Sequence, residues 1–97
     1  MSDLHFEWGP AKAATNQRKH GVSFDEAATA FADEYGLVIS DPDHSADEDR
    51  FILLGLSGAA RHLVVVHAFR ESEAVIRIIS ARKATRAERR QYEERRG

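Results

Sequence analysis

The sequence contains no cysteine, which excludes disulfide bonds and thiolate-ligated metal sites. It has no low-complexity segment and no apolar run long enough for a transmembrane helix, and its first residues show no signal-peptide pattern. The 97 residues have an ordinary charged share of 31% and a hydrophobic share of 42%. We therefore expect one small α+β domain over residues 1–97, cytoplasmic and without a membrane partner.

Basic residues are scarce in the first part of the chain and abundant in the last. Residues 1–60 carry 4 Lys and Arg against 11 Asp and Glu, whereas residues 61–97 carry 10 against 5. The net charge of −2 hides this asymmetry. A basic final third predicts one positive face, which suits a polyanion or an acidic partner, and the acidic remainder favours a localised site.

Short alternating or apolar segments predict strands at residues 4–8, 36–39, 51–56, 61–70 and 75–81. Gly9-Pro10 predicts the start of a helix that ends at His20-Gly21. A capping box at Ser23 and Glu26 predicts a second helix, with Phe24, Ala27, Ala28 and Phe31 as its core face. A third capping signal, Thr85 with Glu88, predicts a final helix over residues 86–96.

The most informative stretch is a predicted hairpin, in which residues 63–69 and 75–81 flank a polar loop at residues 71–74. A symmetric loop pairs Arg70 with Val75 and Ala68 with Arg77. Because side chains alternate between faces, Arg70 and Arg77 then share one face. The same alternation predicts that His67 and Arg82 share the other.

Guanidinium groups on apolar strands are costly unless an anion meets them. Several of them around one hairpin favour an anion-binding site. Two alternatives remain open: carboxylate partners inside the fold, or arginine heads that reach water from the sheet edge.

Two helices have polar faces. Lys12, Asn16, Lys19 and His20 form a stripe on the first helix, which a solvated surface also explains. In the final helix only Ala87 and Tyr92 suit a core, so this helix is either mobile or docked on a partner. The acidic segment at residues 43–49 lacks the spacing of a calcium-binding loop, and the sequence predicts no metal site.

The order of these elements and their motifs resembles the BrnT family of toxins from bacterial type II toxin–antitoxin systems. The matching motifs cover nearly the whole chain: Phe6-Glu7-Trp8, Lys12, Asn16, Lys19-His20-Gly21-Val22-Ser23-Phe24, Asp25-Glu26-Ala27, Arg77-Ile78-Ile79-Ser80-Ala81-Arg82, and Glu88 with Tyr92. One departure is Gly9, where the family commonly has Asp.

The resemblance implies a RelE-like fold, a small twisted antiparallel sheet with two N-terminal helices and one C-terminal helix. It also implies an endoribonuclease that arrests growth by cutting RNA. The implied partner is a ribbon-helix-helix antitoxin like BrnA, which would block the site in a heterotetramer and bring the complex to operator DNA.

RNA cleavage through the 2′-OH needs a base, an acid and cations around the phosphate, and no cofactor. The candidates for phosphate contact are Arg70, Arg77 and Arg82, supplemented by Lys12 and Lys19. The candidates for proton transfer are His20, His67, Glu71 and Tyr92. Arg89 and Arg90 lie in a basic segment that suits RNA or antitoxin docking.

Each candidate has a structural alternative. The alternative for His20 is a basic side chain that complements a helix end, and for His67 it is a hydrogen-bonded position in the core. The alternative for Tyr92 is an anchor of the last helix on the sheet. The alternative functions are a non-catalytic co-repressor module that binds RNA or the antitoxin, and a free-standing RNA-binding protein.

Overall fold

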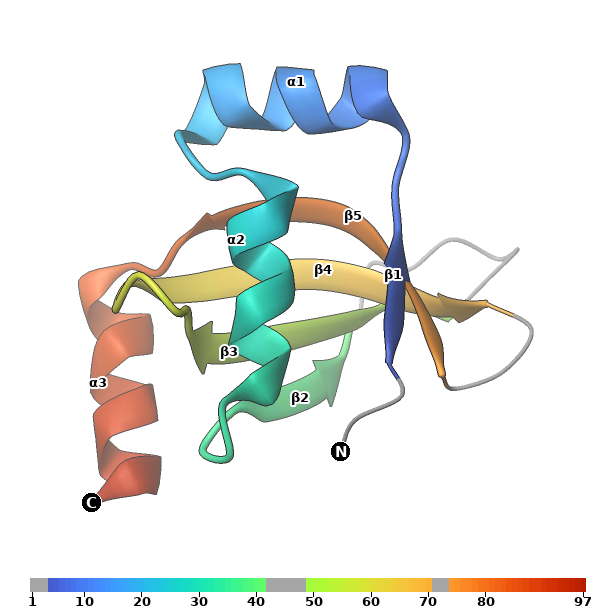
Figure 1. Ribbon diagram of the computed structural model, residues 1–97. Coiled ribbons are helices and arrows are strands. Elements are labelled where there is room, and N and C mark those ends of the chain that lie inside the picture. The colour runs from blue at the N-terminus through green and yellow to red at the C-terminus, as the bar shows by residue number, and fades with distance from the viewer. Residues whose placement is uncertain (1–3, 42–48, 71–73) are drawn as a thin grey trace.

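The computed structural model describes residues 4–41, 49–70 and 74–97. The chain forms one sheet, with two helices and a short 3-10 helix before its long strands and one helix after them. Figure 1 shows how these elements are arranged. In chain order the elements are β1 His5–Glu7, α1 Pro10–His20, α2 Phe24–Thr29, η1 Ala30–Ala32, β2 Leu37–Ser40, β3 Phe51–Leu56, β4 His62–Arg70, β5 Val75–Lys83 and α3 Arg86–Arg96. In this described part of the chain, no helix is long and apolar enough to cross a membrane.

The sheet has the strand order β1-β5-β4-β3-β2. Strands β2 to β5 form an antiparallel meander, and β1 lies parallel to β5, with Phe6 opposite Ile76. The predicted α+β architecture is confirmed. The parallel pairing of β1 was not predicted, because alternation along a strand reveals its faces and not the direction of its neighbour.

One face of the sheet carries the main core. Helix α2 and η1 lie across this face in Figure 1, and Val22, Phe24, Ala27 and Ala30 are buried there. They pack against inward-pointing strand residues: Leu53, Leu63, Val65, Ile78 and Ala81. Trp8 packs against this cluster, with its ring edge-on to that of Phe24 at a centroid distance of 5.9 Å.

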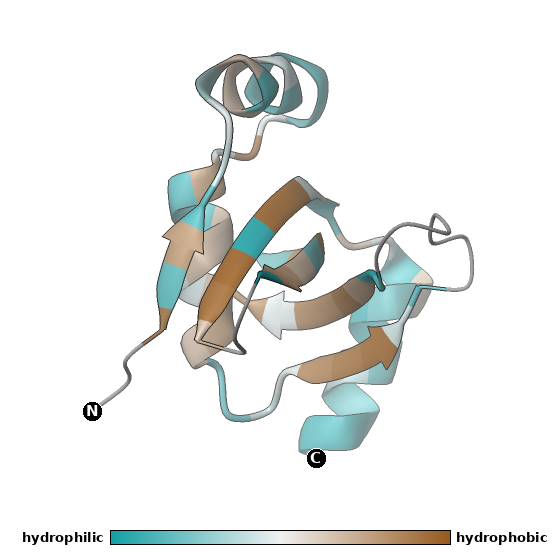
Figure 2. Cartoon of the chain, turned by 90° about the vertical axis from the view of Figure 1, so that its right-hand side faces the viewer, coloured by the Kyte–Doolittle hydropathy of each residue, from teal (hydrophilic) through white to brown (hydrophobic). Residues whose placement is uncertain are grey.

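Helix α3 packs at one end of the sheet. Figure 2 shows that α3 is largely hydrophilic and lies on the side of the sheet away from α2. Its Tyr92 is 1% exposed and packs with Leu54 and Val64. The Tyr92 hydroxyl donates a hydrogen bond of 2.6 Å to Asp33, which follows η1. The one buried side chain of α3 thus holds it to the sheet and to the end of the helical layer.

The helix ends follow the sequence signals, with one correction. Gly21 ends α1 in the left-handed conformation, with φ 70°, and Thr85 and Glu88 form a complete capping box on α3. At α2, the Ser23 side chain accepts a hydrogen bond from the Glu26 backbone N–H as predicted. The Glu26 side chain, however, does not accept the reciprocal hydrogen bond from the Ser23 backbone N–H. It accepts hydrogen bonds from Arg61, because a guanidinium is a stronger donor than a backbone amide.

The β4–β5 hairpin has the predicted register near its loop. Arg70 lies opposite Val75 and Ala68 opposite Arg77, so Arg70 and Arg77 share a face as expected. The register shifts between Val66 and His67, where Ile79 is an extra residue on β5.

This bulge changes the face of Arg82. Beyond it, Val64 lies opposite Arg82, so Arg82 lies on the face of Val64 rather than on that of His67. The predicted pairing of His67 and Arg82 on one face is therefore wrong, because one inserted residue reverses the alternation. The bulge instead places Arg82 on the same face as Arg70 and Arg77.

Candidate functional site

A basic cleft lies between α1 and the edge of β5. It has a volume of about 220 Å³ and is lined by Lys12, Thr15, Asn16, Lys19, His20, Ile79 and Ser80. Residues three, four and seven apart lie on one side of a helix, so the polar stripe of α1 forms a single face. In the structure this face lies toward β5. The structure thus brings together three residues that the sequence analysis selected, Lys12, Lys19 and His20.

Asn16 fixes α1 against the sheet. Its side-chain oxygen accepts the Ala81 N–H at 3.1 Å, and its side-chain nitrogen donates to the Ala81 carbonyl at 2.9 Å. The same nitrogen also donates to the Val22 carbonyl at 3.0 Å. The carboxamide bonds to the backbone of Ala81 as a residue of a neighbouring strand would. It does so beyond Arg77, the last residue of β5 that pairs with β1. Asn16 is 6% exposed, so the α1 stripe is not simply a solvated surface.

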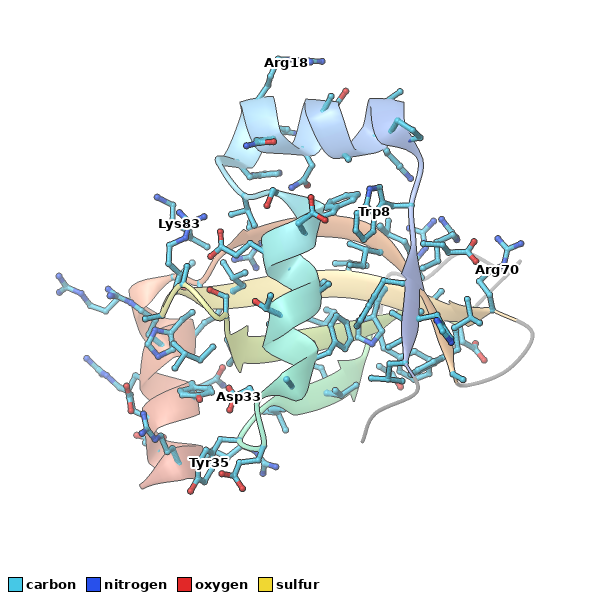
Figure 3. All side chains as sticks on the ribbon, viewed as in Figure 1. Trp8, Arg18, Asp33, Tyr35, Arg70 and Lys83 are labelled. Atoms are coloured by element: carbon cyan, nitrogen blue, oxygen red, sulfur yellow. The ribbon has the colours of Figure 1, made fainter. Side chains whose placement is uncertain are left out.

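The cations of the cleft are available to a ligand. Lys12 and Lys19 are exposed and His20 is partly exposed. None of the three side chains makes a hydrogen bond or ion pair with another described residue. The last turn of α1 also carries Arg18, and Figure 3 shows it pointing away from the body of the protein. The cleft therefore offers two ammonium groups and one imidazole to an anion.

A second row of polar side chains follows β5. Arg77, Ser80 and Arg82 lie on the face opposite the α2 layer, because the bulge at Ile79 restores their alignment. Ser80 lines the α1 cleft, whereas Arg82 lines a groove beside α3. The cleft and the arginine row therefore meet at Ser80.

Two arginines of the hairpin meet carboxylates within the fold, one of the alternatives raised by the sequence. Arg82 donates two hydrogen bonds of 2.9 Å to the oxygens of Glu88. Arg70 and Glu7 form a looser, half-exposed pair at 3.9 Å. The Arg82 hydrogen bonds lower the pKa of Glu88 to about 2, and the same contact raises the pKa of Arg82.

His67 lies in the core rather than at the cleft. It is 1% exposed and contacts the rings of Phe31, Phe51 and Phe69, with centroid distances of 4.8, 6.1 and 5.7 Å. Its Nδ1 lies 3.1 Å from the Val65 carbonyl. Burial lowers the pKa of His67, which favours the neutral ring. This placement agrees with the core alternative and leaves no route to a substrate on the surface.

Tyr92 is also placed as a structural residue. Burial, followed by the hydrogen bond to Asp33, raises the pKa of Tyr92 to about 12. A buried phenol held in its neutral form is a poor base. Arg89 and Arg90 are exposed on α3, and Glu71 lies outside the described residues.

An apolar groove lies on the α3 side of the sheet. It has a volume of about 130 Å³ and a floor of Leu37, Ile39, Ile52, Leu54 and Val64. Arg82, Glu88 and Gln91 form its polar margin. This groove was not predicted from the sequence, because its floor comes from three separate strands whose order in the sheet the residues did not reveal.

Ser80 was likewise not predicted as a cleft residue, although it lies inside the motif from Arg77 to Arg82. Within residues 4–41, 49–70 and 74–97, no three His, Asp or Glu side chains gather in an arrangement that would hold a metal ion.

The fold and the site define a small α+β domain with a basic cleft beside its sheet. Residues 8–88 match the family described as "Ribonuclease toxin, BrnT, of type II toxin-antitoxin system", and the chain belongs to this family. The fold is similar to the 1.1 Å crystal structure of the Brucella abortus ribonuclease toxin BrnT. That similarity has a TM-score of 0.61 at 21% identity and covers 86% of this chain and 99% of the other. No curated protein matches the sequence.

Proposed function

We propose that this protein is an endoribonuclease toxin that cuts RNA in the cleft between α1 and β5, without a metal ion. The observation that carries this proposal is the convergence of Lys12, Lys19 and His20 on one cleft beside Ser80. Membership of a ribonuclease toxin family supports RNA as the substrate.

The proposed reaction uses the 2′-OH of the substrate. Removal of its proton lets the oxygen attack the adjacent phosphorus, and the bond to the 5′-oxygen of the next nucleotide breaks. The products are a 2′,3′-cyclic phosphate and a 5′-OH end, the latter after the leaving oxygen takes up a proton. Lys12 and Lys19 hold the phosphate and offset its developing charge.

His20 is the residue of this cleft that we assign to proton transfer, because an imidazole ring can both accept and donate a proton. Arg77 and Arg82, on the same side of β5 as Ser80, extend the cationic surface for the RNA backbone. Arg70 lies further along this face and is proposed as a more distant RNA contact. Glu71 stays a sequence-based candidate for the second proton-transfer step.

The proposed partner is a ribbon-helix-helix antitoxin like BrnA, which would form a heterotetramer through its own dimerisation and bind operator DNA for the complex. The apolar groove beside α3 supports a protein partner, because interfaces between proteins combine an apolar centre with a polar margin. This surface lies on the same face as Arg82, so a bound antitoxin would also cover part of the proposed RNA surface.

A second candidate function is a non-catalytic co-repressor that only binds the antitoxin or RNA. The pairing of Arg82 with Glu88 and of Arg70 with Glu7 favours it, because those guanidinium groups already have anionic partners. This candidate predicts antitoxin binding and operator repression without RNA cleavage.

The deciding experiment incubates antitoxin-free protein with end-labelled RNA in EDTA and maps the new ends, with and without translating ribosomes. Cleavage that leaves cyclic phosphate or 3′-phosphate ends supports the proposed reaction. The matched variants are Lys12→Gln/Lys19→Gln and a control, Arg18→Gln/Arg96→Gln, which removes the same charge elsewhere. If the wild type and the control cut RNA and Lys12→Gln/Lys19→Gln does not, the result supports the cleft between α1 and β5 as the site of cleavage. Absence of cleavage under every condition, with antitoxin binding intact, establishes the co-repressor function.

A further inference from the structure

A second basic hollow lies beside the cleft, at the far end of β5. It has a volume of about 500 Å³ and is lined by Ala60, Arg61, His62, Lys83, Ala84 and Arg89. Four of these six residues carry basic side chains and none is acidic. Three separate parts of the chain contribute to it: the β3–β4 turn, the end of β5 and the first turn of α3.

The basic side chains of the hollow differ in whether other residues hold them in place. Arg61 is held by Glu26 and donates a hydrogen bond of 3.1 Å to the Gly21 carbonyl. His62 is held edge-on against the Tyr92 ring, at a centroid distance of 4.9 Å. The side chains of Lys83 and Arg89 are exposed, and neither side chain makes a hydrogen bond or ion pair with any described residue. Both fixed residues lie beside a carboxylate, because the Nε2 of His62 is 3.6 Å from an oxygen of Glu93 and Arg61 is paired with Glu26. The two cations of the hollow that remain available to a ligand are therefore Lys83 and Arg89.

The hollow continues the cleft between α1 and β5. Arg61 bonds to Gly21, the residue directly after His20 of the cleft, and Lys83 is three residues beyond Ser80 along β5. Figure 3 shows Lys83 between the C-terminal end of α1 and the start of α3. A single extended strand of nucleic acid that occupies the cleft would therefore pass directly over the hollow.

We infer that this hollow binds the phosphate backbone of the RNA strand next to the point of cleavage, with Lys83 and Arg89 as the contacting residues. The inference rests on the proposed ribonuclease function. Among the described residues that line the hollow, Ala60 and Ala84 are apolar and the other four are basic. Protein partners need an apolar centre, whereas interfaces with nucleic acids are polar and strongly basic, so RNA fits this surface better than a peptide.

The test measures binding of a single-stranded 2′-O-methyl RNA, which cannot be cut through its 2′-OH, by fluorescence anisotropy at several salt concentrations. The variant is Lys83→Gln/Arg89→Gln, and the control is Arg18→Gln/Arg96→Gln with the same loss of charge. Each phosphate contact contributes about −0.7 to the slope of log K against log salt for a single strand. Loss of two contacts should therefore reduce the slope by about 1.4 in the variant and leave it near the wild-type value in the control.

The outcomes separate this inference from the proposed function. If the wild type binds and cuts RNA but the variant and the control have equal slopes, the hollow is not an RNA site and the proposed function stands. If the variant keeps its RNA slope but loses affinity for the antitoxin, the hollow binds the protein partner and the inference is overturned. If the wild type neither binds nor cuts RNA, both proposals fail. Thermal unfolding of each variant checks that the fold is intact.

Discussion

The guanidinium of Arg82 and the carboxylate of Glu88 form a two-bond pair, with both hydrogen bonds at 2.9 Å. Glu88 also accepts the Thr85 N–H at 2.8 Å, so one carboxylate closes the capping box of α3 and joins this helix to β5. Tyr92 provides the second attachment of α3. The helix is therefore docked by specific side-chain contacts, among them those of Glu88 and Tyr92, rather than by a broad apolar stripe.

Replacement of Glu88 by Gln should destabilise the protein by about 1–2 kcal/mol, because the pair loses its charge while a hydrogen-bonding side chain remains. The measurement is the free energy of unfolding from urea denaturation. Glu94→Gln, an exposed change on the same helix, is the control and should change stability by less than about 0.5 kcal/mol. Equal effects of the two substitutions would show that the pair with Arg82 adds nothing to stability.

Acid should weaken the fold through three carboxylates whose pKa values the structure lowers, Glu26, Asp33 and Glu88. Each binds protons less readily in the folded state than in the unfolded state. Their contribution is present above about pH 4.5 and is lost as the pH falls toward the lowered values, which for Glu88 is a pKa of about 2. Urea denaturation between pH 7 and pH 3 measures this loss. In Glu88→Gln the decline below pH 4.5 should be shallower, and an unchanged decline would assign it to other groups.

Asn16→Ala should cost about 2–4 kcal/mol, because it leaves the N–H and carbonyl of Ala81 without the carboxamide that satisfies them. It should also lower RNA cleavage, since α1 would no longer hold Lys12 and His20 in place. Gln17→Ala, an exposed neighbour, is the matched control for both readouts. A stable Asn16→Ala protein would indicate that water replaces the carboxamide at the edge of β5.

The two central histidines should behave in opposite ways. His20→Gln should reduce RNA cleavage by about 10²–10⁴-fold with little effect on stability, as expected for the loss of a proton-transfer group. His67→Phe should leave cleavage nearly intact, because the surrounding rings of Phe31, Phe51 and Phe69 suit an aromatic side chain. Initial cleavage rates and melting temperatures of both variants provide the comparison. Loss of cleavage in His67→Phe alone would move the proposed site to the core face.

Tyr92→Phe should preserve cleavage and lower stability by about 1–2 kcal/mol, because the hydrogen bond to Asp33 is lost while the ring remains. The wild type should also lose stability as the pH rises from 10 toward about 12, since the folded state retains the phenolic proton longer than the unfolded chain. Tyr92→Phe should not show this alkaline loss to the same extent. A variant that is fully stable but inactive would instead indicate a catalytic hydroxyl.

Sequence patterns predicted the elements well, because capping residues, Gly21 and strand alternation act over a few neighbouring residues. They also selected Lys12, Lys19 and His20, whose helical spacing places them on one side of α1. The face of Arg82 was not predictable, since Ile79 looks like any other strand residue and only pairing with β4 reveals the bulge. The attachment of Glu26 to Arg61 was missed for a related reason, as the two residues are distant in sequence and a local capping box was a sufficient explanation.

The carboxamide of Asn16 has a further consequence for the edges of the sheet. Along β5, residues Val75 to Arg77 pair with β1 and Ala81 pairs with Asn16, and the edge strand on this side, β1, is only three residues long, so this side of the sheet offers little backbone to another chain. At the opposite edge, β2 pairs only with β3 among the described strands, and its Val38 and Ile39 are 49% and 52% exposed. Extension of the sheet by a strand from another molecule is thus directed to β2 and away from the basic cleft.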